Sequence, residues 1–243
     1  MCRSWKKSCE VYRSLPLNPQ CAMLPHMKIY ALFLLGAVST SIPSAPSMVL
    51  FDNSEVRVLR AFEKGPDLGK FHQHNLNRVM VYLQSSRQRF EYQDGRKPET
   101  FDWTAGEVKW SLADGMHAGQ VLGKDFNIIE TELKVPGTSR PLAGKLDPLK
   151  VDPAQFKLEF ENPQVRVLRI RIKPHAAVPA HAYSTDRVTV FLTDQQFRSK
   201  DGSGKTETVE HKAGDVAWDM PATLTEENLS DKPFEALTIE VKK

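Results

Sequence analysis

The chain has 243 residues, of which 40% are hydrophobic and 26% are charged, and these values exclude a disordered or fibrous protein. Its three cysteines are too few for a disulfide-based scaffold. Residues 1–45 hold five Lys/Arg and one Glu, so the remainder carries 28 basic and 29 acidic residues. This balance does not indicate nucleic acid or an acidic membrane as a partner.

Residues 1–45 are predicted to be a leader. The apolar run Ile29–Val38 follows Met27-Lys28 and precedes small residues that end at Ala45, an order typical of a secretory signal peptide. The run is shorter than the about 20 residues that span a bilayer. Met27 is a better start than Met1, so we expect an over-long gene start; an extended basic leader and a buried hydrophobic helix are the alternatives.

A secretory leader predicts a secreted or periplasmic protein with no stable membrane span after the signal is removed. All three cysteines precede residue 27, so the mature protein would have no thiol for catalysis, zinc binding or disulfides.

The remaining sequence contains an internal repeat. Phe51–Arg60 recurs as Phe160–Arg169, with seven of ten positions identical at an offset of 109. After one turn the offset becomes 108, and Ala105–Trp110 matches Ala213–Trp218. We therefore predict two units, residues 46–134 and residues 157–243.

The two units are joined by a predicted linker, residues 135–156. The stretch from Val135 to Pro153 contains four prolines and two glycines, which predict neither helix nor interior strand.

Each unit has the pattern of short strands. Val108 and Trp110 alternate with Lys109 and Ser111, which gives one apolar and one polar face. β-branched and aromatic runs bounded by Asp-Gly turns continue this pattern, and no long helical period interrupts it. The sequence predicts an all-β fold, an antiparallel sandwich or barrel in each unit, with Trp110 and its counterpart Trp218 in the core.

Two motifs resemble those of the cupin superfamily. The first is Gly69 followed by His72-Gln73-His74, and the second is Gly106–Trp110 followed by His117. Because both landmarks are duplicated in order, the chain resembles a bicupin. This resemblance implies two tandem antiparallel jelly-roll barrels, and a homodimer is expected from it.

The resemblance also implies a metal site at His72, His74 and His117. His72 and His74 lie two residues apart, so on a strand both imidazoles would share one face. Three neutral imidazoles suit a divalent transition metal: Zn, Mn, Fe, Ni or Cu. A hydrogen-bonded histidine pair without metal is the alternative.

The chain departs from the cupin pattern in both units. The motif's glutamate position holds Arg78 or Val79, and a guanidinium beside a dication lowers affinity unless a carboxylate or bound anion lies between them. In the second unit Tyr183 replaces the second histidine, and Thr225 aligns with His117. We expect the second unit to be a packing partner or a metal-free binding cup.

Arg78 and Tyr82 are the candidate substrate-binding residues. Arg78 could hold a carboxylate, a sugar acid or a phosphate through a bidentate pair. The alternatives are an internal ion pair with Glu130 or Glu132, or a solvent-exposed charge.

Two functions compete. One is an exported metal-dependent cupin enzyme, such as a dioxygenase, isomerase or decarboxylase, acting on a small organic molecule. The other is a bicupin without metal that binds a small ligand or serves a structural role. The fold alone does not choose between them.

Overall fold

The computed structural model describes residues 47–142 and 144–243. The predicted leader, residues 1–45, lies outside the described residues. Within the described part of the chain, no helix is long and apolar enough to cross a membrane.

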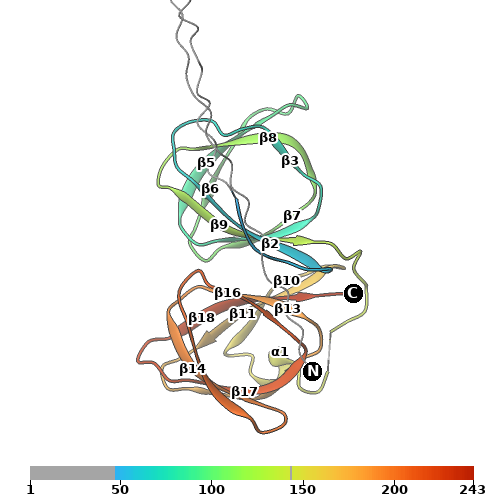
Figure 1. The fold of residues 1–243 in the computed structure, drawn as a ribbon, viewed down its shortest axis with the longest axis vertical. Coiled ribbons are helices and arrows are strands. Elements are labelled where there is room, and N and C mark those ends of the chain that lie inside the picture. Colours follow the sequence, from blue (N-terminus) through green and yellow to red (C-terminus); the bar gives the residue numbers. More distant parts are fainter. Residues whose placement is uncertain (1–46, 143) are drawn as a thin grey trace, which may run out of the picture. The chain divides into compact units, whose positions relative to one another are not determined.

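Nine strands form the first barrel, drawn in blue to yellow-green in Figure 1. One sheet has the order β1-β2-β9-β4-β7 and the other has the order β3-β8-β5-β6. All pairs are antiparallel. The strands are β1 (Met48–Asp52), β2 (Val56–Glu63), β3 (His72–His74), β4 (Arg78–Tyr82), β5 (Ser86–Tyr92), β6 (Glu99–Trp103), β7 (Val108–Ser111), β8 (Asp114–Val121) and β9 (Phe126–Leu133).

The second barrel, drawn in yellow to red, repeats this arrangement with β10-β11-β18-β13-β16 and β12-β17-β14-β15. Strand for strand, the two orders are the same, which confirms the predicted all-β fold of two tandem jelly-roll barrels. The strands are β10 (Phe156–Glu161), β11 (Val165–Ile172), β12 (Ala177–Tyr183), β13 (Arg187–Phe191), β14 (Gln195–Asp201), β15 (Thr206–His211), β16 (Val216–Asp219), β17 (Ala222–Asn228) and β18 (Phe234–Val241).

The most similar stretch of the two repeats is a hairpin with a shared turn. Asn53 Oδ1 accepts hydrogen bonds from the backbone N–H groups of Glu55 and Val56, at 2.8 and 2.9 Å. Asn162 makes the equivalent pair of contacts, with Gln164 and Val165, at 2.8 and 3.0 Å. An asparagine side chain that bonds its own backbone two or three residues ahead stabilises such turns.

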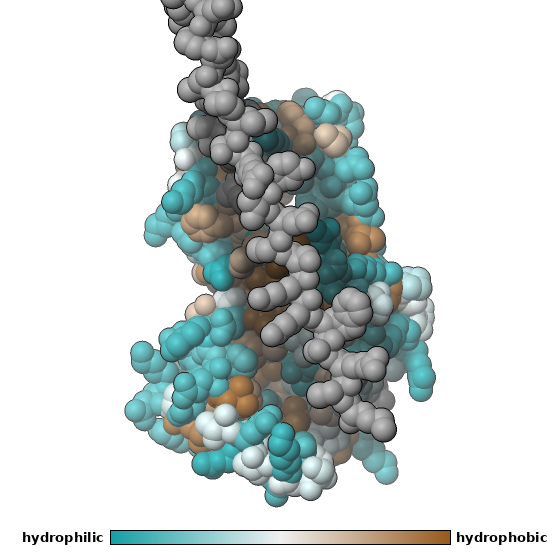
Figure 2. All heavy atoms as spheres, viewed as in Figure 1, coloured by the Kyte–Doolittle hydropathy of each residue, from teal (hydrophilic) through white to brown (hydrophobic). Residues whose placement is uncertain are grey.

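The five-stranded sheets of the two barrels pack against each other. Strand alternation directs Val56 and Val58 of β2 into the same apolar cluster as Val165 and Val167 of β11, and all four are fully buried. Burying each such side chain contributes about 1.5–3 kcal/mol. Trp110 and Trp218 pack against this cluster as predicted. Hydrophobic residues gather where the barrels meet, whereas the visible outer faces are mostly hydrophilic (Figure 2).

One expectation for the linker is wrong. Residues 148–151 form a helical turn, α1 (Pro148–Val151), and Asp147 caps it by accepting from the backbone N–H of Leu149 at 3.0 Å. Pro148 occupies the first turn of this helix, where the missing N–H has no intrahelical acceptor to lose. Asp147 also holds buried Arg166 at 2.7 Å, which fastens the turn to β11.

Candidate metal centre

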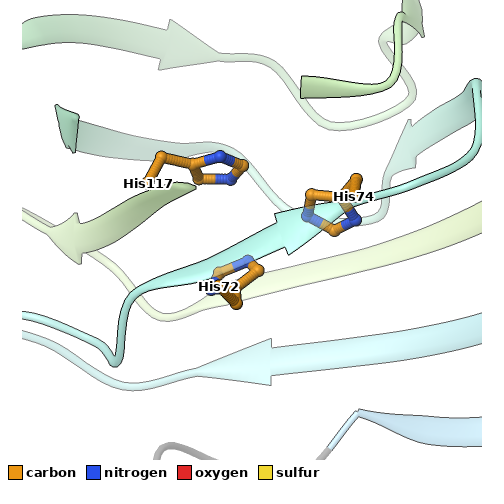
Figure 3. Close-up of side chains that lie close together, drawn as sticks. All are labelled: His72, His74 and His117. Carbon is orange, nitrogen blue, oxygen red and sulfur yellow. The ribbon is translucent and has the colours of Figure 1, made fainter. Parts of the chain in front are cut away.

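Three imidazoles converge inside the first barrel. His72 and His74 lie on β3, and the antiparallel pairing of β3 with β8 sets His72 directly opposite His117. The ring centroids are 4.7, 5.0 and 5.3 Å apart, and Figure 3 shows the rings gathered around one space. One nitrogen from each ring lies within 4.8 Å of the others. This spacing is wider than the roughly 3–4 Å between the ligands of one tetrahedral zinc ion.

Backbone carbonyls orient two of the rings. His72 Nδ1 lies 2.9 Å from Lys70 O, and His117 Nδ1 lies 3.0 Å from Gly115 O. Because a carbonyl oxygen only accepts, each Nδ1 carries the hydrogen, so in the neutral ring Nε2 is the nitrogen that has the lone pair. Metal-binding histidines are held in this way, with the distal nitrogen bonded to a carbonyl or carboxylate.

The surroundings keep the imidazoles of His74 and His117 neutral. Burial, followed by the charge of Arg78, lowers the pKa of His74 to about 3. Burial also lowers the pKa of His117, against the hydrogen bond to the Gly115 carbonyl. Neutral imidazole is the form that binds metal. The donor set therefore fits a divalent transition metal.

Arg78, at the cupin glutamate position, points into the barrel beside Glu130 of β9. Arg78 Nε lies 3.2 Å from Glu130 Oε2, and both side chains are almost fully buried. Burial raises the pKa of Glu130, and the Arg78 charge opposes that rise. The same carboxylate oxygen is 3.9 Å from His74 Nδ1. Glu130 thus contacts both the guanidinium and the imidazole cluster, which offsets the repulsion that Arg78 would exert on a bound cation.

A cavity of about 410 Å³ opens beside the imidazoles and is lined by all three of them. Aromatic residues form much of its wall. Tyr82 stacks on Trp103 with centroids 4.3 Å apart, and Phe90 meets His117 edge-on at 5.7 Å. Tyr82 is 1% exposed, and burial raises the pKa of its hydroxyl. Arg78 and Tyr82 both line the cavity, while their roles in substrate binding stay predictions.

Three hydrogen-bonded side chains in the lining of the same cavity were not predicted from the sequence. Trp103 Nε1 donates to Gln88 Oε1 at 3.0 Å, and Gln88 Nε2 donates to Glu63 Oε2 at 3.3 Å. Burial raises the pKa of Glu63. The alternation of Phe101 and Trp103 around Asp102 was the available signal for this wall, because it places both rings on one face of a strand.

The second barrel keeps only one of the three imidazoles. His181 Nδ1 lies 3.0 Å from Pro179 O, as His72 does from its own carbonyl. Its Nε2 faces Glu226 Oε2 at 3.4 Å inside the protein. Tyr183, which replaces the second histidine, lies with its ring centroid 5.4 Å from that of His181.

The alignment of Thr225 with His117 is wrong. In the second barrel His181 pairs with Leu224, as His72 pairs with His117 in the first. Leu224 follows Asp219, the end of β16, by five positions, whereas His117 follows Ser111, the end of β7, by six, so the offset at this position is 107. A shift of one residue moves a strand side chain to the opposite face. The cavity of the second barrel accordingly includes Leu224 and Glu226 in its lining.

Comparison with known proteins places the fold. No protein-family model and no curated protein matches the chain. Among solved structures, AerE from Microcystis aeruginosa is 11% identical with a TM-score of 0.56, covering 83% of this chain and 98% of that one. A cupin 2 conserved barrel domain protein from Leptotrichia buccalis is 14% identical with a TM-score of 0.51, covering 84% and 92%.

Oxalate decarboxylase from Bacillus subtilis is also similar in structure. It is 14% identical with a TM-score of 0.53, covering 78% of this chain and 68% of that one. Another structure of that enzyme, 13% identical with a TM-score of 0.50 and covering 78% and 69%, is described by its Mn(II) centres. Together with the strand order of both halves, these likenesses confirm the resemblance of the motifs: this chain has the cupin fold in its duplicated, bicupin form.

Proposed function

We propose that the first barrel holds a divalent transition metal at His72, His74 and His117 and acts on a small organic molecule bound in the adjoining cavity. The observation that carries this proposal is the convergence of three imidazoles, two of them with Nδ1 bonded to a carbonyl. A metal with open positions would supply Lewis-acid or redox chemistry there. Manganese is among the candidates, because a Mn-containing decarboxylase shares the fold.

The residues of this chain give the cavity its selectivity. The stacked pair Tyr82 and Trp103 gives the cavity an apolar aromatic wall, which suits the apolar part of a substrate. The Arg78–Glu130 pair keeps a guanidinium beside the imidazoles, where it would orient an anionic or electron-rich substrate group. The cavity of about 410 Å³ suits a small organic molecule.

A bicupin that binds a small ligand without metal is the second candidate. The observation that favours it is Arg78, which brings a fixed positive charge to the position of the fourth cupin ligand.

Metal analysis separates the two candidates. Protein produced with Mn, Fe, Zn, Ni and Cu available should purify with about one equivalent of metal. His72→Ala and His117→Ala should each lose that metal, whereas the exposed His175→Ala should retain it. Native-like circular dichroism of the variants would show that loss of metal is not loss of fold. Metal-free wild-type protein, or metal retained in both site variants, would overturn the proposal.

Export is proposed from the leader alone. Mature protein starting near Ser44 should be recovered outside the cytoplasm, and an intact N-terminus on cytoplasmic protein would contradict this. A homodimer is proposed from the cupin resemblance, and light scattering of the purified protein tests it.

A further inference from the structure

A crevice of about 340 Å³ lies between the barrels, away from the imidazoles. Two equivalent turns border it, at Gly106 (φ 81°) and Gly214 (φ 89°). An arginine of each barrel reaches the turn of the other barrel. Arg169 Nη2 donates to Gly106 O at 2.7 Å, and a Cβ placed on Gly214 would lie 3.3 Å from Arg60 Nη2. Arg60 and Arg169 occupy equivalent positions in the two repeats, so the surroundings of one arginine can be compared directly with those of the other.

Carboxylates neutralise Arg169. Its Nε pairs with Glu159, and its Nη1 lies 2.5 Å from Glu235 Oε1. Its side chain is 11% exposed, so this pairing offsets the cost of burying the charge.

Arg60 has neither carboxylate. The offset of 109 puts Leu50 at the position of Glu159, and the offset of 108 puts Asn127 at the position of Glu235. Arg60 Nε donates to Asn127 Oδ1 at 3.2 Å instead. Within residues 47–142 and 144–243, Arg60 has no ion-pair partner, although its side chain is half-buried. A half-buried guanidinium without a counter-charge is a ready ligand for an anion.

Among the residues that the structure describes, Arg60 is the arginine of the crevice lining that has no carboxylate partner. The other two lining arginines, Arg169 and Arg171, both pair with Glu235. Thr193 Oγ1 accepts from the backbone N–H of Glu235 at 2.9 Å, which leaves its hydroxyl hydrogen free to donate.

We propose that this crevice binds a small oxyanion (phosphate, sulfate or a carboxylate) that supplies to Arg60 the negative charge which Glu159 and Glu235 supply to Arg169. Its oxygens accept from the Arg60 guanidinium and from the Thr193 hydroxyl. Because Arg60 belongs to the first barrel and Thr193 to the second, the bound anion links the two barrels. This site is independent of the metal centre, and neither proposal requires the other.

The test is a set of anion titrations of the full mature chain. Binding is measured by thermal unfolding and by calorimetry. Sodium phosphate, sulfate and acetate are each compared with sodium chloride at equal ionic strength. A saturable rise in Tm of about 3–6 °C is expected once the preferred anion exceeds its Kd about tenfold. The phosphate and sulfate arms against the acetate arm distinguish a tetrahedral dianion from a carboxylate.

Asn127→Glu copies the second barrel's arrangement into the first. It should remain folded, have a Tm in chloride at least equal to that of the wild type, and lose the anion response. Arg60→Gln should also lose the response. Arg57→Gln, on the same strand but 44% exposed and facing Asp52 at 3.9 Å, should keep it. The proposal would be overturned if the wild type showed no saturable response. It would also be overturned if Asn127→Glu and Arg60→Gln responded to the anion as strongly as the wild type.

Discussion

The two barrels share one strand order but differ at the position of the candidate metal centre. In the first barrel His72 faces two more imidazoles, and in the second its counterpart His181 faces Glu226, with Leu224 opposite it. Both histidines keep the same bond to a carbonyl two residues earlier. The local geometry that orients one imidazole is therefore part of the fold, whereas the metal-binding potential depends on two further side chains.

Glu226 shows how the second barrel accommodates its remaining histidine. The structurally equivalent residue of the first barrel is Gly119, because each pairs with the same position of the neighbouring strand, Ser199 or Phe90. A carboxylate at this position gives His181 Nε2 a polar neighbour at 3.4 Å. With no side chain at Gly119, the corresponding space in the first barrel stays part of the cavity.

Restoring the trio in the second barrel should have the largest effect. Tyr183→His with Leu224→His would place two imidazoles beside His181, because the Tyr183 ring centroid lies 5.4 Å from that of His181 and Leu224 pairs with His181 on the neighbouring strand. In a His72→Ala background, which removes the first site, this double variant should bind about one equivalent of zinc where the background binds none. Calorimetry with zinc measures the difference.

A matched control uses the position that sequence alignment alone would select. Tyr183→His with Thr225→His in the same background should bind no stoichiometric zinc, because residue 225 lies on the opposite face of β17. Equal zinc binding by the two double variants would show that the register of this strand is not as described.

Removing the carboxylate beside Arg78 should have the next largest effect. Glu130→Ala leaves a buried guanidinium without its closest counter-charge, and we expect a loss of about 3 kcal/mol in the free energy of unfolding. If the three imidazoles hold a metal as proposed, its affinity should also fall, by about 10–100-fold, because Glu130 Oε2 lies 3.9 Å from His74 Nδ1. Urea unfolding and metal titration measure the two effects.

The second barrel supplies the control for this change. Thr238 is the counterpart of Glu130, and Arg187 there donates to Met220 O at 2.7 Å, so it keeps a partner in Thr238→Ala. That substitution should cost less than about 1.5 kcal/mol. A loss below about 1 kcal/mol in Glu130→Ala would mean that the Arg78–Glu130 pair adds little to stability.

The duplicated pattern explains how much could be predicted from the sequence. Repeated apolar alternation and turn residues predict an all-β fold twice, and strand alternation puts His72 and His74 on one face. The arrival of His117 beside them was expected only from the resemblance to the cupin motifs. The alignment of Thr225 failed for a different reason. The second repeat has one residue fewer before this strand position and one more in the connection that follows, 229–233 against 122–125. The offset therefore returns to 108 at Phe234, and an alignment that keeps 108 throughout assigns the strand residues in between to the wrong face.

The sequence reduced the candidate ion-pair partners of Arg78 to two carboxylates but did not distinguish between them. Glu130 and Glu132 alternate on one strand and both face inward, so the pattern alone does not distinguish them. The structure brings Glu130 within 3.2 Å of Arg78. Similarly, the linker composition indicated a break in regular structure, but the capping role of Asp147 depends on its contact with Arg166 from β11.

The smallest predicted effect is on the pH dependence of the free energy of unfolding. At the position of His74, only the first barrel should contribute to this dependence. In metal-free protein the pKa of His74 is about 3, below the unfolded value of 6.5. At pH values between these two pKa values the unfolded chain binds more protons than the folded chain. The free energy of unfolding therefore falls as the pH falls. From pH 7 to pH 5 this amounts to a loss of about 2 kcal/mol from His74.

His74→Tyr copies the second barrel, where burial raises the pKa of Tyr183 so that it does not titrate in this range. Urea unfolding in the presence of a chelator at pH 7 and pH 5 should therefore show a loss about 2 kcal/mol smaller in His74→Tyr than in the wild type. Titratable groups remote from His74 contribute to both proteins and cancel in the comparison. Equal losses would mean that the His74 ring accepts a proton within the folded barrel, and a ring protonated near neutral pH would compete with any metal for the same nitrogen.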